Sequence, residues 1–391
     1  MSALVKNGLE TGVKNKSRQA NIELLRILAM FGILIMHMTN HSGVLDYAHE
    51  GVEGHGMAWL LFSPGMHSIN IFLLITGYFM VKQRFSTWKL ARLTGQVLFY
   101  AFFITFIFRT FFDVDKPLKM LIYSILPISS DFYWYASMYA GLLLLSPVLN
   151  KLIYHLTKRQ LLCLCILCFA LVSVWPNIVF FSSGLNTAGG VSISWFISVY
   201  LFGAYIRLYY EPNYKWKIKM LVSIGLLAFL PATRFGLEAL LKTPFGELSL
   251  FQDLMWGYSI FYNYSSILIT ITSIAVFITF LNLRIDSGKV SKVINTVAGA
   301  SFGVYLLTDH AYVRDYLWRW IGVSDYIFEP LKLFGFSLGI GAVLYAAGTV
   351  IELLRQLLFS LWEKDSGLKR AFLRLDERLK DIWNGQKQAD S

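Results

Sequence analysis

Charged residues are scarce in this sequence. They make up 15% of the 391 residues, whereas hydrophobic residues make up 56%. This composition excludes an ordinary soluble protein, because a soluble chain of this size carries far more charge on its surface. The apolar residues come in blocks of about twenty, the length that a helix needs to cross the hydrocarbon core of a bilayer. The sequence therefore predicts an all-α polytopic membrane helix bundle, with the lipid bilayer as its partner.

The motifs of several enzyme and transporter classes are missing. No Walker loop, Rossmann glycine pattern or G-x-S-x-G elbow is found, which excludes ATP-driven transport and the usual serine hydrolases. The few cysteines, Cys163, Cys165 and Cys168, all lie in one apolar block, "LLCLCILCFALVSVW". Within a spanning helix they are better explained as small packing residues than as metal or redox ligands. Residues 1–20 are polar and lack the apolar region of a cleavable signal.

Ten spans are predicted, and an even number places both termini on one side of the membrane. Most of the 35 Lys and Arg residues lie in the tails and loops of that side, so the positive-inside rule predicts that both termini are cytoplasmic. We expect a cytoplasmic tail at 1–20, one ten-helix membrane domain at 21–357 and a basic, amphipathic cytoplasmic tail at 358–391. The spans are predicted at 22–40, 67–82, 90–112, 131–150, 160–180, 191–210, 218–234, 256–282, 298–320 and 331–357.

The net charge of +11 is explained by the same excess of Lys and Arg in the tails and loops of one side, since no folded basic domain is available for nucleic acid. We therefore expect no nucleic-acid partner. In the C-terminal tail, "KRAFLRLDERLKDIW" places Phe372, Leu375, Leu379 and Ile382 at helical spacing opposite a charged face. This pattern predicts a helix that lies along the inner membrane surface.

Two titratable residues interrupt the first span. Arg26 and His37 stand eleven residues apart in "RILAMFGILIMH", so on a helix they share one face and differ in height by about 16 Å. Arg26 is then at the cytoplasmic edge and His37 near the middle of the membrane. Because ionisable residues inside a span are costly, they favour a functional role. The alternative for His37 is a hydrogen bond between helices that serves packing alone.

The ninth span offers a second polar pair. In "SFGVYLLTDHAYVRDYLW", Asp309 and His310 lie near the middle of the membrane if the helix begins near Gly299. An aspartate can hold a histidine of another helix in one tautomer and favour its charged form, as a general base requires. We therefore consider both residues as catalytic candidates, with a packing role as the alternative.

Other polar residues suggest binding sites. Lys89 and Arg92 are three residues apart near the cytoplasmic boundary, and with Arg26 they are candidates to bind a phosphorylated ligand. The alternative is that they are topology determinants whose charged ends reach the interface. Asn70 and Thr76 on the second span are candidates for substrate binding or for helix packing.

At the outer edge of the fourth span, Tyr133 and Trp134 can stack on sugar faces or belong to the interfacial aromatic belt. A zinc site is not predicted. His37 and His41 have the i, i+4 spacing of the two zinc-binding histidines on a metalloprotease helix. However, Met38 stands where that helix needs a glutamate.

Five segments together resemble the acyltransferase-3 family of integral membrane O-acyltransferases. They are "IELLRILAMFGILIMH", "NIFLLITGYFM", "DFYWYASMYAGLLLLSPVLN", "SWFISVYLFGAYI" and "SFGVYLL", and the resemblance covers about residues 20–355. It implies transfer of an acyl group, commonly acetyl from cytoplasmic acetyl-CoA, to a hydroxyl of a cell-envelope polysaccharide or lipid-linked glycan. Acyl-CoA is then a co-substrate, and no cofactor is bound permanently. Bacterial capsule and exopolysaccharide O-acetyltransferases form a branch of similar size, which implies a bacterial plasma membrane.

The resemblance also implies roles for single residues. His37 would be the catalytic histidine, Arg26 the basic group at the CoA-facing end, and Lys89 with Arg92 would match two arginines three apart in many members. This sequence departs from the family pattern at Lys89, because lysine lacks the planar bidentate donor of arginine. It departs again where many members read Tyr-Leu-x-His: Thr308 stands there, and His310 follows two positions later, on another face of the helix.

Two alternatives from other functional classes stay open at this point. One is a non-enzymatic exporter of a glycan or lipid-linked sugar, which would use the same polar groups as a substrate path. The other is a carrier that passes acyl groups to a separate extracellular transferase. The acceptor and the oligomeric state, including a homo-oligomer, are also open.

Overall fold

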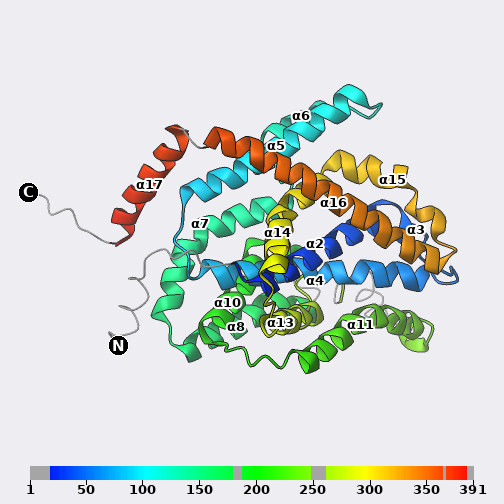
Figure 1. The fold of residues 1–391 in the computed structure, drawn as a ribbon. Coiled ribbons are helices and arrows are strands. Elements are labelled where there is room, and N and C mark those ends of the chain that lie inside the picture. Colours follow the sequence, from blue (N-terminus) through cyan, green and yellow to red (C-terminus); the bar gives the residue numbers. More distant parts are fainter. Residues whose placement is uncertain (1–17, 179–186, 248–260, 364–366, 385–391) are drawn as a thin grey trace, which may run out of the picture.

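The computed structural model describes residues 18–178, 187–247, 261–363 and 367–384. All regular secondary structure in these ranges is helical, and the helices form one bundle (Figure 1). Helices α2 (Ala20–His41) and α4 (His55–Met80) run through its middle, with α5 (Thr87–Phe111) and α16 (Pro330–Glu363) on one flank. The predicted all-α membrane bundle is confirmed.

Ten apolar helical stretches overlap the ten predicted spans, although some of the predicted bounds differ. Within the described ranges eight are long and apolar enough to cross a membrane, and two are shorter. The sidedness of the chain stays a prediction. Besides the four helices above, the long stretches are α7 (Trp134–His155), Lys158–Ile178 (α8 Lys158–Phe169, η1 Ala170–Val174 and α9 Trp175–Ile178), α11 (Trp216–Leu241) and α14 (Gly288–Thr308), and the shorter ones are α10 (Ile193–Tyr209) and α13 (Ile267–Leu281).

Short helices join these elements. They are α3 (Val44–Tyr47), α6 (Leu118–Ile125), η2 (Ala188–Gly190), η3 (Pro244–Glu247), η4 (Val313–Leu317), α15 (Trp318–Ile321) and η5 (Val323–Tyr326), and α17 (Gly367–Asn384) follows the last span. The peripheral helices expose apolar side chains such as Phe106, Leu221 and Leu357. This arrangement suits a bundle whose outer faces contact lipid tails.

The predicted second span begins too late. It was expected at 67–82, but α4 begins at His55 and continues through Pro64. Polar side chains of α4 find partners in the bundle. The Ser63 hydroxyl bonds the Tyr262 hydroxyl, and His67 Nδ1 bonds the Ile269 carbonyl.

The predicted ninth span was wrong at both ends. It was expected at 298–320, but α14 begins at Gly288, where Ser287 caps the helix by accepting from the Val290 N–H. The helix ends at Thr308, before Asp309 and His310. By helix rise, Asp309 therefore lies about 30 Å beyond the start of α14, rather than half-way along it.

Two glycines allow α4 and α10 to cross closely. A Cβ on Gly77 would collide with the backbone of Tyr200, and a Cβ on Gly203 would collide with the Leu74 carbonyl. Small residues at such crossings let membrane helices pack backbone against backbone. The side chains between α4 and α10 are therefore held at short range.

Gly203→Ala is expected to destabilise the protein by about 1–3 kcal/mol, because the added methyl group forces two backbones apart. Gly225→Ala is the control, since no atom lies within 4 Å of a Cβ at that position. Thermal unfolding of the purified protein in detergent measures the difference. Equal melting temperatures for the two variants would contradict a tight crossing.

Candidate active site

The structure brings His37 of α2 together with Asp309, the residue that follows α14. His37 Nδ1 lies 3.6 Å from Asp309 Oδ1, and Arg314 Nη1 lies 3.8 Å from the same oxygen. The side chains of His37 and Asp309 are 13% and 4% exposed. A histidine and a carboxylate that are both mostly buried thus lie beside a guanidinium that is 31% exposed.

The end of α14 positions Asp309 and Arg314. The Asp309 N–H still donates to the Tyr305 carbonyl, but its backbone leaves helical geometry at φ −99° and ψ 6°. The chain then enters the π-helical turn η4, which contains Arg314. Single π-helical turns are frequent at functional sites, where they redirect side chains. Here the turn directs Arg314 back onto the Asp309 carboxylate.

His37 has the surroundings of a general base. Its Nδ1 is enclosed and has no hydrogen bond at the observed distance to Asp309. Catalytic hydrogen bonds are often this long before substrate binds. A carboxylate beside Nδ1 favours the tautomer that carries the proton there, and the lone pair is then on Nε2. Nε2 is therefore the atom of His37 that can accept a proton.

His310 has a different place in the structure. Its Nε2 lies 3.2 Å from the Ala101 carbonyl and 3.1 Å from the Thr105 hydroxyl, while its Nδ1 accepts from the Tyr312 N–H. The proton is therefore on Nε2, and both ring nitrogens are occupied. The side chain is fully buried. His310 ties the end of α14 to α5 and has no nitrogen left for proton transfer.

The aromatic candidates are also buried in the bundle. Tyr133 is 0% exposed, and its hydroxyl donates to the Leu306 carbonyl. It therefore offers no ring face to a sugar. Trp134 is partly buried and stacks on Tyr264 at 5.8 Å between ring centroids. One face of its indole ring is thus already covered.

Asn70 and Thr76 lie on α4. Asn70 is fully buried, donates to the Tyr264 carbonyl and accepts from the Trp195 indole. These two bonds join α4 to α10 and to the segment before α13. The Thr76 hydroxyl donates to the Phe72 carbonyl within its own helix.

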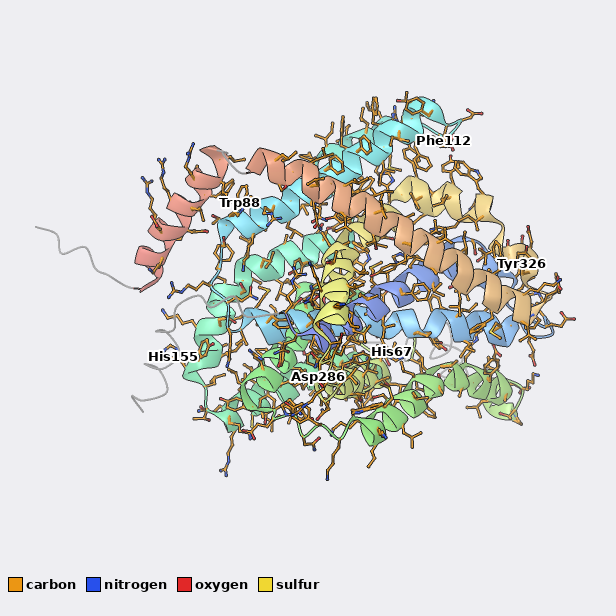
Figure 2. All side chains as sticks on the ribbon, viewed as in Figure 1. His67, Trp88, Phe112, His155, Asp286 and Tyr326 are labelled. Atoms are coloured by element: carbon orange, nitrogen blue, oxygen red, sulfur yellow. The ribbon has the colours of Figure 1, made fainter. Side chains whose placement is uncertain are left out.

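A basic cavity of about 640 Å³ opens beside the start of α5. Lys89 and Arg92 line it together, as their spacing predicted, and no acidic residue is among its described lining side chains. Trp88 lies at this end of α5, far from Phe112 at the other end (Figure 2). The cations of the lining are Arg18, Arg84, Lys89, Arg92 and Arg355.

Arg26 is not one of these lining residues. Its Nη1 lies 3.5 Å from Glu23 Oε2, within α2. It is nevertheless close enough to interact electrostatically with Tyr139, which lines the cavity. Arg26 therefore lies near one of the residues that line the cavity.

Sequence reasoning missed Glu352 and Arg355. Glu352 is 1% exposed and accepts two hydrogen bonds from Arg355, at 2.8 and 2.7 Å, and others from Tyr100, Gln96 and Gln356. This buried carboxylate holds the Arg355 guanidinium at the cavity wall. A signal was present, because "VIELLRQ" places an acid and a base three residues apart inside a predicted span.

A row of tyrosines connects the cavity with His37. Tyr139 stacks on Tyr135 at 6.1 Å between centroids, Tyr135 meets Tyr305 at 5.9 Å, and Tyr305 meets the His37 ring at 6.5 Å. Contacts between aromatic rings thus run from the cationic cavity to the candidate base. The arrangement can bind an anion at one end and transfer a proton at the other.

Comparison with known proteins gives one match. A family model described as an acyltransferase domain, that of the acyltransferase-3 family, matches residues 19–351. No curated protein and no solved structure matches the chain. The matched residues contain both His37 and the lining residues Lys89 and Arg92.

Glu352→Gln is expected to destabilise the protein by about 3–5 kcal/mol, because it leaves the buried Arg355 charge without a partner. Glu329→Gln is a matched control, since Glu329 also pairs with a cation three residues later on the same segment but is exposed. An exposed pair contributes about 0–1 kcal/mol. Chemical unfolding of both variants gives the comparison, and similar losses would argue against a structural ion pair at Glu352.

Proposed function

Because the chain belongs to the acyltransferase-3 family, we propose that it transfers an acyl group, in the simplest case acetyl, from cytoplasmic acyl-CoA to a glycan hydroxyl. Membership establishes a membrane acyltransferase. The donor, the acceptor and a bacterial plasma membrane location are parts of the proposal. The observation that carries it is the row of tyrosines from the cationic cavity to the His37–Asp309 pair.

The cavity suits the phosphates of the donor. Guanidinium groups form paired, charge-assisted hydrogen bonds with phosphate oxygens. Arg84 and Arg92 line the cavity, whereas the Arg355 guanidinium in its wall already pairs with Glu352. Lys89 adds a point charge. A volume of about 640 Å³ is within the usual range for small-molecule sites. The thioester arm of acyl-CoA would then extend along Tyr139, Tyr135 and Tyr305 toward His37.

The reaction at His37 is a direct transfer. The acceptor hydroxyl oxygen attacks the thioester carbonyl carbon while His37 Nε2 takes the hydroxyl proton. The C–S bond breaks, and the proton passes to the leaving sulfur, so the products are an ester and free CoA. Asp309 holds the Nδ1 proton and stabilises the imidazolium that forms in between, and Arg314 balances the charge of Asp309.

His37→Ala is expected to reduce ester formation by about 10²–10⁴-fold, the usual contribution of a general base. Asp309→Asn should cause a smaller loss, because the base remains but its tautomer is no longer held. The measurement is the acetate content of the exported glycan from cells that carry each variant. His155→Ala, a change at an exposed histidine at the end of α7, should leave it unchanged. Normal acetate content in the glycan of the His37→Ala cells would show that His37 is not the general base.

Purified protein in lipid separates this proposal from export. With labelled acetyl-CoA, an enzyme releases free CoA and labels the acceptor, whereas an exporter moves the glycan unchanged. A carrier for a separate transferase would consume acetyl-CoA only together with that partner.

Arg92→Gln is expected to weaken CoA binding about 10–100-fold, because a charged hydrogen bond contributes about 1.5–3 kcal/mol. Lys89→Arg should retain or strengthen binding, since it restores a bidentate donor. Calorimetry with CoA in detergent provides the affinities. Arg109→Gln, at the far end of α5, is the control and should bind like the unaltered protein. If Arg92→Gln binds CoA normally, the cavity does not hold the donor.

A further inference from the structure

Helix α17 lies crosswise at the end of the bundle where α5 begins and α16 ends (Figure 1). It is anchored to α5 by one carboxylate. Asp376 Oδ1 accepts from the Thr87 N–H and the Thr87 hydroxyl, both at 2.6 Å, and Oδ2 accepts from the Ser86 hydroxyl at 2.8 Å. The Thr87 hydroxyl also bonds the Phe372 carbonyl, and the Phe372 ring meets Trp88 at 5.9 Å.

Asp376 thereby caps α5 from a distant part of the chain. Ser86, at the N-cap position, makes no capping bond with its own side chain, so the first N–H groups of α5 depend on another acceptor. A carboxylate is the favoured group at this end of the helix dipole. Burial raises the pKa of Asp376, but the bonds from Thr87 and Ser86 outweigh it and hold the pKa below its usual value. The start of α5 is therefore bound to an ionised carboxylate.

The rest of α17 has the pattern of a helix at a lipid surface. Leu368, Leu375 and Leu379 share one face and are 50%, 42% and 38% exposed. Successive residues turn by about 100°, so cations border this face on both sides, while Arg370 and Glu377 lie opposite. The bordering cations are Lys369 and Lys380 on one side, and Arg374 and Arg378 on the other.

We propose that α17 binds the anionic headgroups of the adjacent leaflet, and that this contact holds the start of α5 in place. Leu375 and Leu379 enter the acyl boundary, and the flanking cations meet lipid phosphates. The crosswise direction of α17 at the end of the bundle fits a helix in the plane of the membrane surface.

The contact has a consequence for the basic cavity. Leu368 of α17 lines the cavity together with Ser86, Trp88 and Lys89. A displaced α17 therefore removes part of the cavity wall and frees the turn that carries Lys89. That the ligand affected is acyl-CoA rests on the proposed function, whereas the lipid contact does not.

Hydrogen exchange of the full-length protein tests the proposal in two kinds of nanodisc. One contains phosphatidylcholine alone, and the other contains about one third phosphatidylglycerol, whose charge attracts basic segments. Anionic lipid is expected to slow exchange at residues 367–380 and 86–92 on the order of 10-fold. The double variant Arg374→Gln/Arg378→Gln should lose most of this effect, because two of the cations that attract the anionic surface are removed.

Two further variants separate the parts of the proposal. Arg370→Gln removes a cation from the opposite face of the same helix and should keep the lipid effect. Asp376→Asn should leave α17 protected in anionic lipid but abolish the slowing at 86–92. Equal exchange in both lipids would overturn the lipid contact. If anionic lipid slows exchange in α17 but not at residues 86–92 of the unaltered protein, the coupling to α5 is overturned.

CoA affinity in the same nanodiscs keeps the two proposals distinguishable. We expect tighter CoA binding in anionic lipid for the unaltered protein. A protein that shows lipid-dependent exchange but binds no CoA in either lipid would contradict the proposed donor and leave the lipid contact standing.

Discussion

A charge within hydrocarbon needs a partner, and this requirement organises the bundle. In the described parts of the spans and their ends, Glu23, Glu238, Asp309 and Glu352 each lie beside a cation. An unpaired charge inside a span is costly, and each of these carboxylates has a cation three to five residues away in the chain. Two of them also join helices: Gln96 and Tyr100 of α5 donate to Glu352 of α16, and His37 of α2 lies beside Asp309 at the end of α14. These two junctions are also the two ends of the proposed reaction path.

The path between these junctions is aromatic rather than charged. Tyr135 packs against both Tyr139 and Tyr305, and the three rings bury large apolar surfaces. In the proposed reaction, anion binding at the cavity and proton transfer at His37 therefore take place at separate positions.

Much of the site could be predicted from the sequence, for an identifiable reason. His37, Asp309, Lys89 and Arg92 stand out because ionisable residues are rare in this apolar background. The roles of Tyr133 and His310 could not be predicted, since burial and ring hydrogen bonds depend on helices far away in the chain. Glu352 is likewise an ionisable residue in an apolar background. Its role in binding Arg355 and Tyr100 is seen only in the structure.

By itself the sequence determined the membrane bundle, the ten apolar helices and the family, because hydrophobic length and local motifs are properties of contiguous residues. It also placed Lys89 and Arg92 on one face of one helix. Only the tertiary structure decided where α14 ends, that His37 meets Asp309, and that Asp376 caps α5. These outcomes depend on contacts between residues some 270 to 290 positions apart, and the free energy of such contacts has no local signature in the sequence.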